Sequence, residues 1–338
     1  MAKLYLEDEV FGELFPFIKD GQITDINYNG KDLWVDHLTR GRYRVASFQA
    51  DTGFLNRFSM RIANLMNRSF NQYEPLLEAE TDELRISIIH ESVTNTGRSI
   101  SIRKTPGIRR LDRRRMLDTG YCTAELDIFM ANAVRAGLTL VAAGLPGAGK
   151  TEYLKAMTAY IPANKKVITI EDNLEIRYRA INPDKDGIEI KVGDTFSYGK
   201  AIKASMRQLP GWLILSEARS LEAEYLLESM STGVSCMTTI HTDDVRKIPD
   251  RICSMLKKDV TDDVYSFLNL GVLIGCYNVP GKGICRRIEQ AALFDRCQGV
   301  NTVTVFYEDG RMSRPRLPET MLRKFAFAGI EDPFCEAG

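Results

Sequence analysis

The stretch Gly144-Leu145-Pro146-Gly147-Ala148-Gly149-Lys150-Thr151 fits the pattern G-x-x-x-x-G-K-[ST], which is typical of a phosphate-binding loop. The short apolar run 138–143 before it predicts a buried strand. After the loop, Leu154, Met157 and Ile161 recur at helical spacing. The sequence therefore predicts a strand, a glycine-rich loop and a helix in succession, which is the setting that phosphate binding needs.

The chemistry of this loop is specific. Glycines let the backbone approach the phosphates, and amide groups at the start of the helix point at the negative charge. Lys150 is placed to reach the β- and γ-phosphates, and the Thr151 hydroxyl to ligate Mg²⁺. A glycine-rich turn that only opens a helix is the plain alternative, and the strand and helix around the loop count against it. We predict that the chain binds a nucleoside triphosphate.

Bulk properties narrow the class of protein. At 338 residues, two domains are expected, and 44% hydrophobic and 27% charged residues are ordinary for a soluble globular protein. Lys+Arg and Asp+Glu both number 45, so no overall basic charge argues for nucleic-acid binding. The first residues lack the apolar stretch of a signal peptide, and no run approaches the ~20 apolar residues of a membrane span. We expect membrane association to be peripheral, through partners.

The cysteines and histidines do not suggest a disulfide framework or a metal site. Seven cysteines form no C-x-x-C pair and are odd in number, which argues against secreted disulfides and against zinc. The three histidines show no metal-ligand spacing. We expect buried, reduced thiols in a cytosolic protein.

The first hundred residues predict a smaller α+β domain over 1–105. Strand-like runs at 23–28 and 33–35 flank an Asn-Gly turn, which is a hairpin signal. Residues 84–88 and 98–103 alternate apolar and polar side chains as strands do. This alternation puts Arg85 and Arg103 on the face away from the core. From the spacing alone, each arginine is simply a solvated charge.

Residues 106–120 are predicted to be a basic interdomain linker. Pro106-Gly107 breaks the strand pattern, and an arginine cluster follows at 109–115. Such a cluster is usually solvated. It could also contact an acidic surface of a neighbouring subunit, a nucleotide or lipid headgroups, and the sequence leaves these alternatives open.

From residue 121 to 310, strands alternate with helices, which is the α/β signature; 311–338 is predicted to be a C-terminal extension with a short helix over 319–327. Three apolar strands end in polar groups: Glu171 with Asp172, Glu217, and His241. Open α/β sheets bind ligands at the carboxyl ends of their strands. Glu217 could hold Mg²⁺ or polarise the nucleophile. Asp172 could equally cap a helix, and a lone histidine is more often structural.

The ordered segments 144–151, 169–172, 207–219 and 238–241 together resemble the secretion-ATPase superfamily. These proteins are the motors of type II and type IV secretion, of conjugation and of type IV or Tad pili. The similarity is greatest to the shorter, single-module members of conjugative systems and Tad pili. It implies an α/β fold, with a RecA-like P-loop NTPase domain preceded by a smaller, PAS-like α+β domain.

The resemblance assigns a role to each matching residue. The four segments correspond to the Walker A loop, Asp box, Walker B segment and His box of the family. Lys150 and Thr151 then hold phosphate and Mg²⁺, and Glu171 matches the Asp-box acid proposed to activate water. Glu217 matches the Walker B acid and His241 the residue that senses nucleotide state. Whether Glu171 or Glu217 is the general base stays open.

Four arginines and three departures from the family pattern complete the comparison. Arg85 and Arg103 match amino-terminal arginines offered to the phosphates, and Arg207 and Arg219 match arginines near the phosphates or the subunit interface. The nucleotide-binding residues expected from the loop and the resemblance are Gly144, Pro146, Gly147, Ala148, Gly149, Lys150, Thr151, Arg85, Arg103, Arg207 and Arg219. The family commonly has Asp at 211 and Gly at 216, where this chain has Gly211 and Ser216, and its Leu145-Pro146 replaces a frequent Thr-Gly. All the charged residues of the family pattern are present in this chain, so we expect ATP hydrolysis.

The resulting hypothesis is Mg²⁺-dependent ATP hydrolysis by a ring, a homo-hexamer by resemblance. The ring would be cytoplasmic, peripheral at the cytoplasmic membrane, and would pass work to inner-membrane secretion or pilus components. A nucleotide-binding assembly scaffold with weak hydrolysis is the first alternative, motivated by Gly211 and Ser216. A DNA-translocating ATPase is the second, and the neutral net charge argues against it and against direct nucleic-acid binding.

Overall fold

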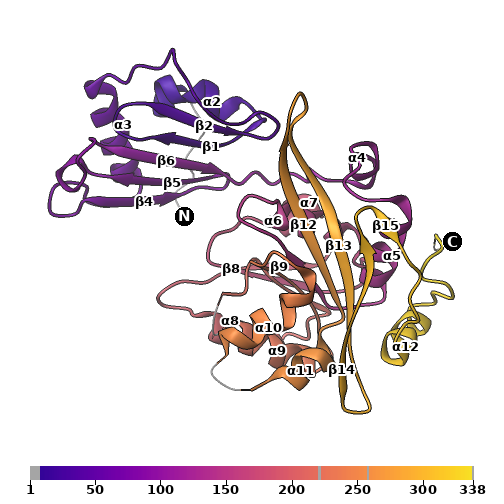
Figure 1. Cartoon of the computed structure of the whole chain (residues 1–338). Helices are drawn as coiled ribbons and strands as arrows, with labels where there is room; N and C mark the ends of the chain where they lie inside the picture. Colours follow the sequence, from indigo (N-terminus) through magenta and orange to yellow (C-terminus); the bar gives the residue numbers. More distant parts are fainter. Residues whose placement is uncertain (1–7, 220–221, 257–258, 337–338) are drawn as a thin grey trace. The chain divides into compact units, whose positions relative to one another are not determined.

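A computed structural model describes residues 8–219, 222–256 and 259–336 (Figure 1). The chain divides into two compact units. Unit 1 comprises Met1–Pro106 and Tyr277–Cys285, and unit 2 comprises Gly107–Cys276 and Arg286–Gly338. Within the described ranges, none of the helices has both the length and the apolar character needed to cross a bilayer.

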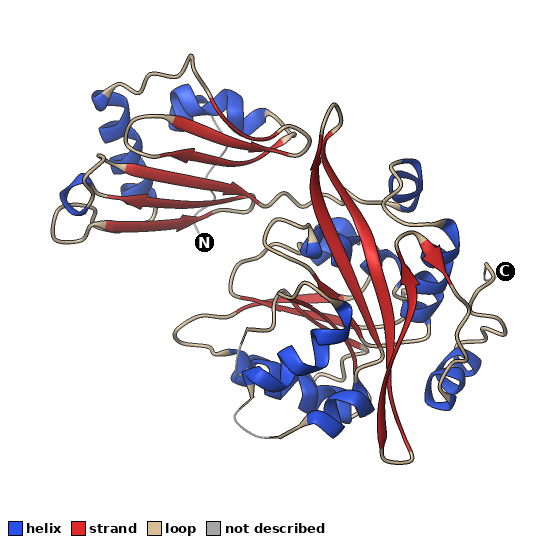
Figure 2. Cartoon of the chain, in the orientation of Figure 1, coloured by secondary structure: helices blue, strands red, loops and turns tan. Residues whose placement is uncertain are grey.

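Unit 1 is built on a six-stranded antiparallel sheet in the order β3-β2-β1-β6-β5-β4 (Figure 2). Its elements are α1 (Asp8–Phe11), the 3₁₀ turn η1 (Gly12–Leu14), α2 (Phe15–Lys19), β1 (Ile23–Tyr28), β2 (Leu33–His37), β3 (Gly41–Arg44), α3 (Thr52–Leu65), β4 (Leu76–Glu80), β5 (Leu84–Ile89), η2 (Glu91–Val93) and β6 (Ser99–Lys104). The predicted hairpin of β1 and β2 and the predicted strands β5 and β6 are confirmed.

The core of unit 1 lies on one face of this sheet. Ile86 and Ile102 are fully buried and belong to the same apolar cluster as Phe58 and Ile62 of α3. Successive strand residues point to opposite faces. The other face therefore carries the intervening polar residues, including Arg85 and Arg103, as the alternation predicted.

Unit 2 is built on a nine-stranded sheet in the order β15-β14-β13-β12-β7-β11-β10-β8-β9. Strands β12, β7, β11, β10, β8 and β9 are parallel, and β13, β14 and β15 are antiparallel. Its elements are α4 (Arg113–Asp118), α5 (Ala124–Arg135), β7 (Leu140–Ala143), α6 (Lys150–Met157), η3 (Thr158–Tyr160), β8 (Val167–Glu171), α7 (Tyr178–Ile181), β9 (Gly187–Lys191), α8 (Tyr198–Met206), β10 (Trp212–Leu215), α9 (Glu222–Ser231), β11 (Ser235–Ile240), η4 (Val245–Lys247), α10 (Ile248–Met255), α11 (Thr261–Phe267), β12 (Leu270–Val279), β13 (Gly283–Cys297), β14 (Val300–Glu308), β15 (Arg311–Met312) and α12 (Glu319–Phe327).

Helices cover both faces of the unit 2 sheet (Figure 1). Leu140 and Ala142 of β7 pack into the cluster formed with α5, α6 and α12, whereas Val141 and Ala143 pack into the cluster formed with α8 to α11. Such two-sided burial explains why these strands are continuous apolar runs in the sequence. The predicted α/β architecture and the helix over 319–327 are confirmed.

The predicted linker is largely folded into unit 2. Arg109 donates to the backbone oxygens of Lys155 and Ile181 at 3.2 and 3.0 Å, and α4 begins only four residues later. Arg113 pairs with the buried carboxylate of Asp127 at 3.0 Å. Two arginines of this basic cluster thus stabilise unit 2, in place of the solvated or intermolecular roles that the sequence left open.

The cysteines differ in part from the prediction. All seven are unpaired. Cys122 and Cys236 are buried as expected, but Cys276, Cys297 and Cys335 are exposed. The expectation of buried thiols is wrong for those three, because they lie in the exposed last part of β12, at the end of β13 next to its hairpin turn, and in the C-terminal segment.

Candidate nucleotide-binding site

The predicted site residues of unit 2 gather at one edge of the parallel sheet. In the strand register, Ala143 at the end of β7 faces Ile240 at the end of β11, and Ile170 of β8 faces Leu215 at the end of β10. The next residues along these strands begin the glycine-rich loop and supply Glu171, Glu217 and His241. Segments far apart in the sequence therefore meet where an open α/β sheet binds its ligand.

Two glycines fix the shape of the loop. A Cβ at Gly144 would lie 2.6 Å from the backbone oxygen of Ile274 on β12, so a larger residue has no room there. Gly149 has a φ of 90° and precedes α6 without a side-chain cap. The first N–H groups of a helix have no partner within the helix. At α6 they face the loop, where a phosphate would satisfy them.

Lys150 extends into the loop and is almost fully buried. Its Nζ donates to the backbone oxygens of Gly144 and Leu145 at 3.0 and 3.3 Å and lies 3.2 Å from Nδ1 of His241. Burial lowers the pKa of Lys150 to about 8, and the carboxylates of Glu217 and Glu175 oppose that shift. A buried ammonium held only by carbonyls and a neutral ring is well suited to exchange them for an anion.

His241 links the loop lysine to Glu217. Burial and the nearby Lys150 charge lower the pKa of His241, so its ring is neutral at neutral pH. Nδ1 then accepts from Lys150, and the proton on Nε2 is donated to Oε1 of Glu217 at 3.2 Å. One tautomer satisfies both contacts. The lysine and the glutamate are thereby connected through one ring.

Arg219 closes the other side of this network. Its guanidinium contacts Oε2 of Glu217 at 2.8 Å and Oδ2 of Asp172 at 3.3 Å. The hydrogen bond with Glu217 raises the pKa of Arg219 further. The structure therefore brings together Lys150, His241, Glu217, Arg219 and Asp172, which the sequence placed on four separate segments.

Glu171 lies beneath this network and not within it. Its side chain is fully buried, and Oε1 accepts from the backbone N–H groups of Glu175 and Ile176, both at 3.1 Å. Burial raises the pKa of Glu171 to about 8, despite those two hydrogen bonds. In this geometry the carboxyl group of Glu171 holds the 172–176 turn, whereas Glu217 and Asp172 are the partly exposed acids that contact Arg219.

This burial of Glu171 predicts a pH-dependent stability. The pKa of Glu171 is higher in the folded chain than in the unfolded one. Its contribution to the free energy of unfolding is therefore complete below about pH 4.5 and is lost as the pH rises through about 8. Glu171→Gln, which mimics the protonated form, should lack this decline and be more stable than wild type above pH 8 by roughly a few kcal/mol. Urea unfolding of both chains below pH 4.5 and above pH 8 measures this difference in the free energy of unfolding. Equal pH slopes for Glu171→Gln and wild type would contradict the assignment, and exposed Glu228→Gln is the control.

Two residues at the site were missed from the sequence. The carboxylate of Glu175 acts electrostatically on Lys150, and the hydroxyl of Tyr198, on α8, accepts from the Asp172 N–H at 3.1 Å. An acid four residues after the strand end was the available signal for Glu175. No local pattern indicated Tyr198, because α8 reaches the site only through the packing of the sheet.

The departures from the family pattern lie in different places: Leu145-Pro146 is in the loop itself, Ser216 follows the carboxyl end of β10, and Gly211 precedes β10. Gly211 and Arg207 precede β10 and therefore lie at the amino-terminal edge of the sheet, opposite the loop. The structure does not bring Arg207 to the phosphate loop of its own chain. A Cβ at Gly211 would lie 3.1 Å from Cβ of Lys165, so a larger residue there would require a small shift of Lys165. Ser216 is buried beside Tyr198.

Arg85 and Arg103 belong to unit 1 and are directly opposite each other on β5 and β6. Like charges in such a pair destabilise a sheet. Arg103 also contacts Asp25 on β1 at 2.9 Å. Two neighbouring arginines on a solvent-facing sheet surface form a place where an anion is favoured. Their contact with a nucleotide stays a prediction.

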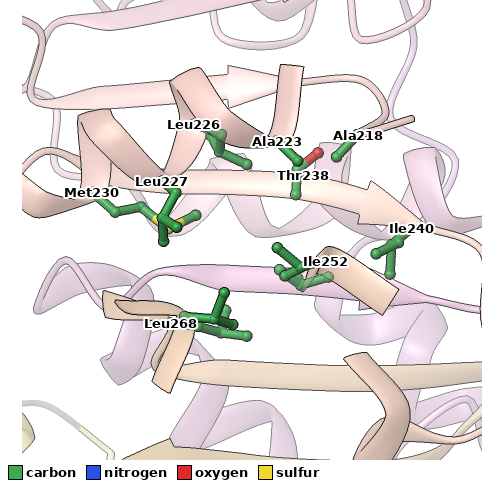
Figure 3. Close-up of a pocket in the computed structure, with 11 residues that line it drawn as sticks. Ala218, Ala223, Leu226, Leu227, Met230, Thr238, Ile240, Ile252 and Leu268 are labelled. Carbon is green, nitrogen blue, oxygen red and sulfur yellow. The ribbon is translucent and has the colours of Figure 1, made fainter. Parts of the chain in front are cut away.

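An apolar pocket lies close to the site but does not belong to its chemistry. It is lined by residues of α9, α10 and β11, among them Leu226, Met230, Ile240 and Ile252 (Figure 3). The cavity measures about 10 Å³, which is about the room that one water molecule needs. Because its walls are apolar and it is this small, the cavity is a packing defect beside α9 and not a ligand site.

The residues at the sheet edge fit a nucleoside triphosphate with Mg²⁺. The start of α6 is uncapped, Lys150 supplies a buried cation, and Thr151 follows in the first turn of the helix. Glu217 offers a carboxylate that is only partly buried. Hydroxyl and carboxylate oxygens are the ligands that Mg²⁺ prefers in proteins.

Comparison with known proteins agrees with this geometry. The family model described as "Type II/IV secretion system protein" matches residues 76–270. An uncharacterized Bacillus anthracis protein is 25% identical over 83% of this chain, which spans 66% of that relative's length. A putative conjugal transfer protein of Mycobacterium tuberculosis is 23% identical, with 89% of this chain and 90% of the relative covered.

A solved structure shows the same fold. The Yersinia pseudotuberculosis ATPase DotB superposes with a TM-score of 0.65 at 13% sequence identity, covering 86% of this chain and 80% of DotB. Since the family model covers more than half of the chain, membership does not depend on this likeness. The chain belongs to the type II/IV secretion system protein family, and it combines a RecA-like P-loop domain with a smaller amino-terminal domain.

Proposed function

We propose that this chain is an ATPase that powers a secretion, conjugation or pilus machine. The observation that carries the proposal is the network at the sheet edge, in which His241 connects the loop lysine to Glu217. Family membership and the likeness to the ATPase DotB support it. The whole protein's activity and partners are part of the proposal, because the chain spans less than two thirds of its Bacillus relative.

Substrate binding begins with the loop. The phosphates of ATP are expected to bind the N–H groups at the start of α6 and to draw Nζ of Lys150 away from the carbonyls of Gly144 and Leu145. Thr151 and Glu217 would hold Mg²⁺, which supplies charge neutralisation on the transferred phosphate when bound. ATP binding thus replaces the lysine's present partners with phosphate.

Hydrolysis is assigned to Glu217. Its carboxylate is partly exposed and is oriented by both Arg219 and His241. It is placed to orient the attacking water, while buried Glu171 supports the turn beneath. When Lys150 moves to the phosphate, Nδ1 of His241 loses its donor, so the ring can report nucleotide state to Glu217.

Arg85 and Arg103 of unit 1 are proposed to bind the phosphates of ATP. Replacing both by alanine should raise KM for ATP about tenfold or more, because two charge-assisted contacts are lost. Arg44→Ala, on strand β3 of the same sheet, is the matched control and should leave KM unchanged. Steady-state kinetics measures the difference. An unchanged KM in the double variant would remove these arginines from the site.

The motor is proposed to act as a cytoplasmic homo-hexameric ring with inner-membrane components as partners. Sedimentation velocity of the chain with MgATP tests the ring directly. A particle near six subunits supports it. A monomer that binds ATP without turnover would favour the assembly scaffold, and turnover that depends on added DNA would favour the DNA-translocating ATPase.

A further inference from the structure

Strand β13 brings an arginine to the outer side of the phosphate loop. Nε of Arg286 donates to the backbone oxygen of Gly147 at 3.2 Å. The same side chain contacts the loop a second time, since a Cβ built on Gly149 would lie 3.3 Å from Cδ of Arg286. The resemblance to the secretion ATPases assigned no role to this residue.

The position of Arg286 is set by the fold. Two residues along the strand, Ile288 is buried in the core and its N–H donates to the oxygen of Tyr121 at 2.7 Å. Residues i and i+2 of a strand share a face. Arg286 therefore shares the core-facing side of β13, and Arg287 faces the other way beside Glu289.

The loop is held from two sides. On the inside, Lys150 donates to the oxygens of Gly144 and Leu145. On the outside, Arg286 holds the oxygen of Gly147. Ala148 N–H also donates to the oxygen of Leu145 at 3.2 Å, so both ends of the 147–148 peptide group are fixed.

These two sets of contacts behave differently when a phosphate binds. Lys150 must leave its carbonyls to reach the anion, which removes the inner support. The Arg286 contact uses the carbonyl of Gly147, to which Lys150 does not donate, so it can persist. A glycine-rich loop loses much conformational entropy on ordering. An anchor that persists reduces the entropy that nucleotide binding must overcome.

We propose that Arg286 is a positioning residue that holds the phosphate loop in its binding conformation through the Gly147 carbonyl. It acts through the loop backbone and not on the reacting phosphate. This inference rests on the proposed function, since it concerns the affinity of the same site for ATP.

The test compares three variants of the full chain. Arg286→Met keeps the aliphatic stem and removes the donors, Arg286→Lys keeps a cationic donor, and Arg287→Met changes the neighbour on the opposite face. Binding of MgADP is measured by calorimetry, KM and kcat by phosphate release, and folding by the thermal melting of the nucleotide-free chain.

We expect Arg286→Met to raise Kd for MgADP and KM for ATP about tenfold or more, with kcat within roughly threefold of wild type and an unchanged melting temperature. Arg286→Lys should recover most of the affinity, and Arg287→Met should match wild type. A loss of kcat at constant KM would overturn the proposal, as would equal Kd values for Arg286→Met and wild type. If wild type itself binds no MgADP, the proposed function fails before this inference is reached.

Discussion

Glu217→Gln is expected to lower kcat for ATP hydrolysis by roughly 10²–10³-fold while ATP binding is kept. The amide has the same size as the carboxylate but no negative charge, so it cannot polarise a water or balance the guanidinium of Arg219, now 2.8 Å from Oε2. Phosphate release under single-turnover conditions and calorimetric binding of ATP measure the two effects separately.

The control for this variant is Glu228→Gln, an exposed glutamate on α9. It removes one negative charge from the same unit without touching the network and should leave kcat unchanged. A Glu217→Gln chain that hydrolyses ATP at the wild-type rate would contradict the assignment. In that case a group other than Glu217 would have to orient the water.

Lys150→Met is expected to abolish turnover and to weaken ATP binding by about 10²-fold, because the phosphates lose the buried cation. The change has a second cost. The oxygens of Gly144 and Leu145 and Nδ1 of His241 lose their donor. We therefore also expect a lower melting temperature of the nucleotide-free chain.

The matched control is Lys200→Met, an exposed lysine at the start of α8. It should bind ATP like wild type. Equilibrium binding of a fluorescent ATP analogue gives both affinities. Wild-type affinity in Lys150→Met would show that the loop does not bind the phosphates through this lysine.

Much of the fold could be predicted because its signals are local. The central strands of unit 2 are buried on both faces, so they appear in the sequence as apolar runs that end in acids or histidine. Strands β3, β4 and β9 were not predicted. They lie at sheet edges, and β3 alternates half-buried and exposed residues of mostly polar character.

The site could be predicted only in part, because its finer geometry depends on contacts between distant segments. Spacing placed Lys150, Glu217 and His241 at strand ends, but it could not show that Glu171 turns inward while Asp172 turns outward. That choice depends on the layer of helices packed beneath β8. Arg286 acts on a loop 139 residues earlier in the sequence, and no local pattern marks it.

Phosphate release by the purified wild-type chain tests whether it hydrolyses ATP at the loop of residues 144–151. The assay runs with and without Mg²⁺, and Lys150→Met serves as the blank. We expect phosphate release that requires Mg²⁺ and clearly exceeds the blank. Release equal to that of Lys150→Met in the presence of Mg²⁺ would contradict it.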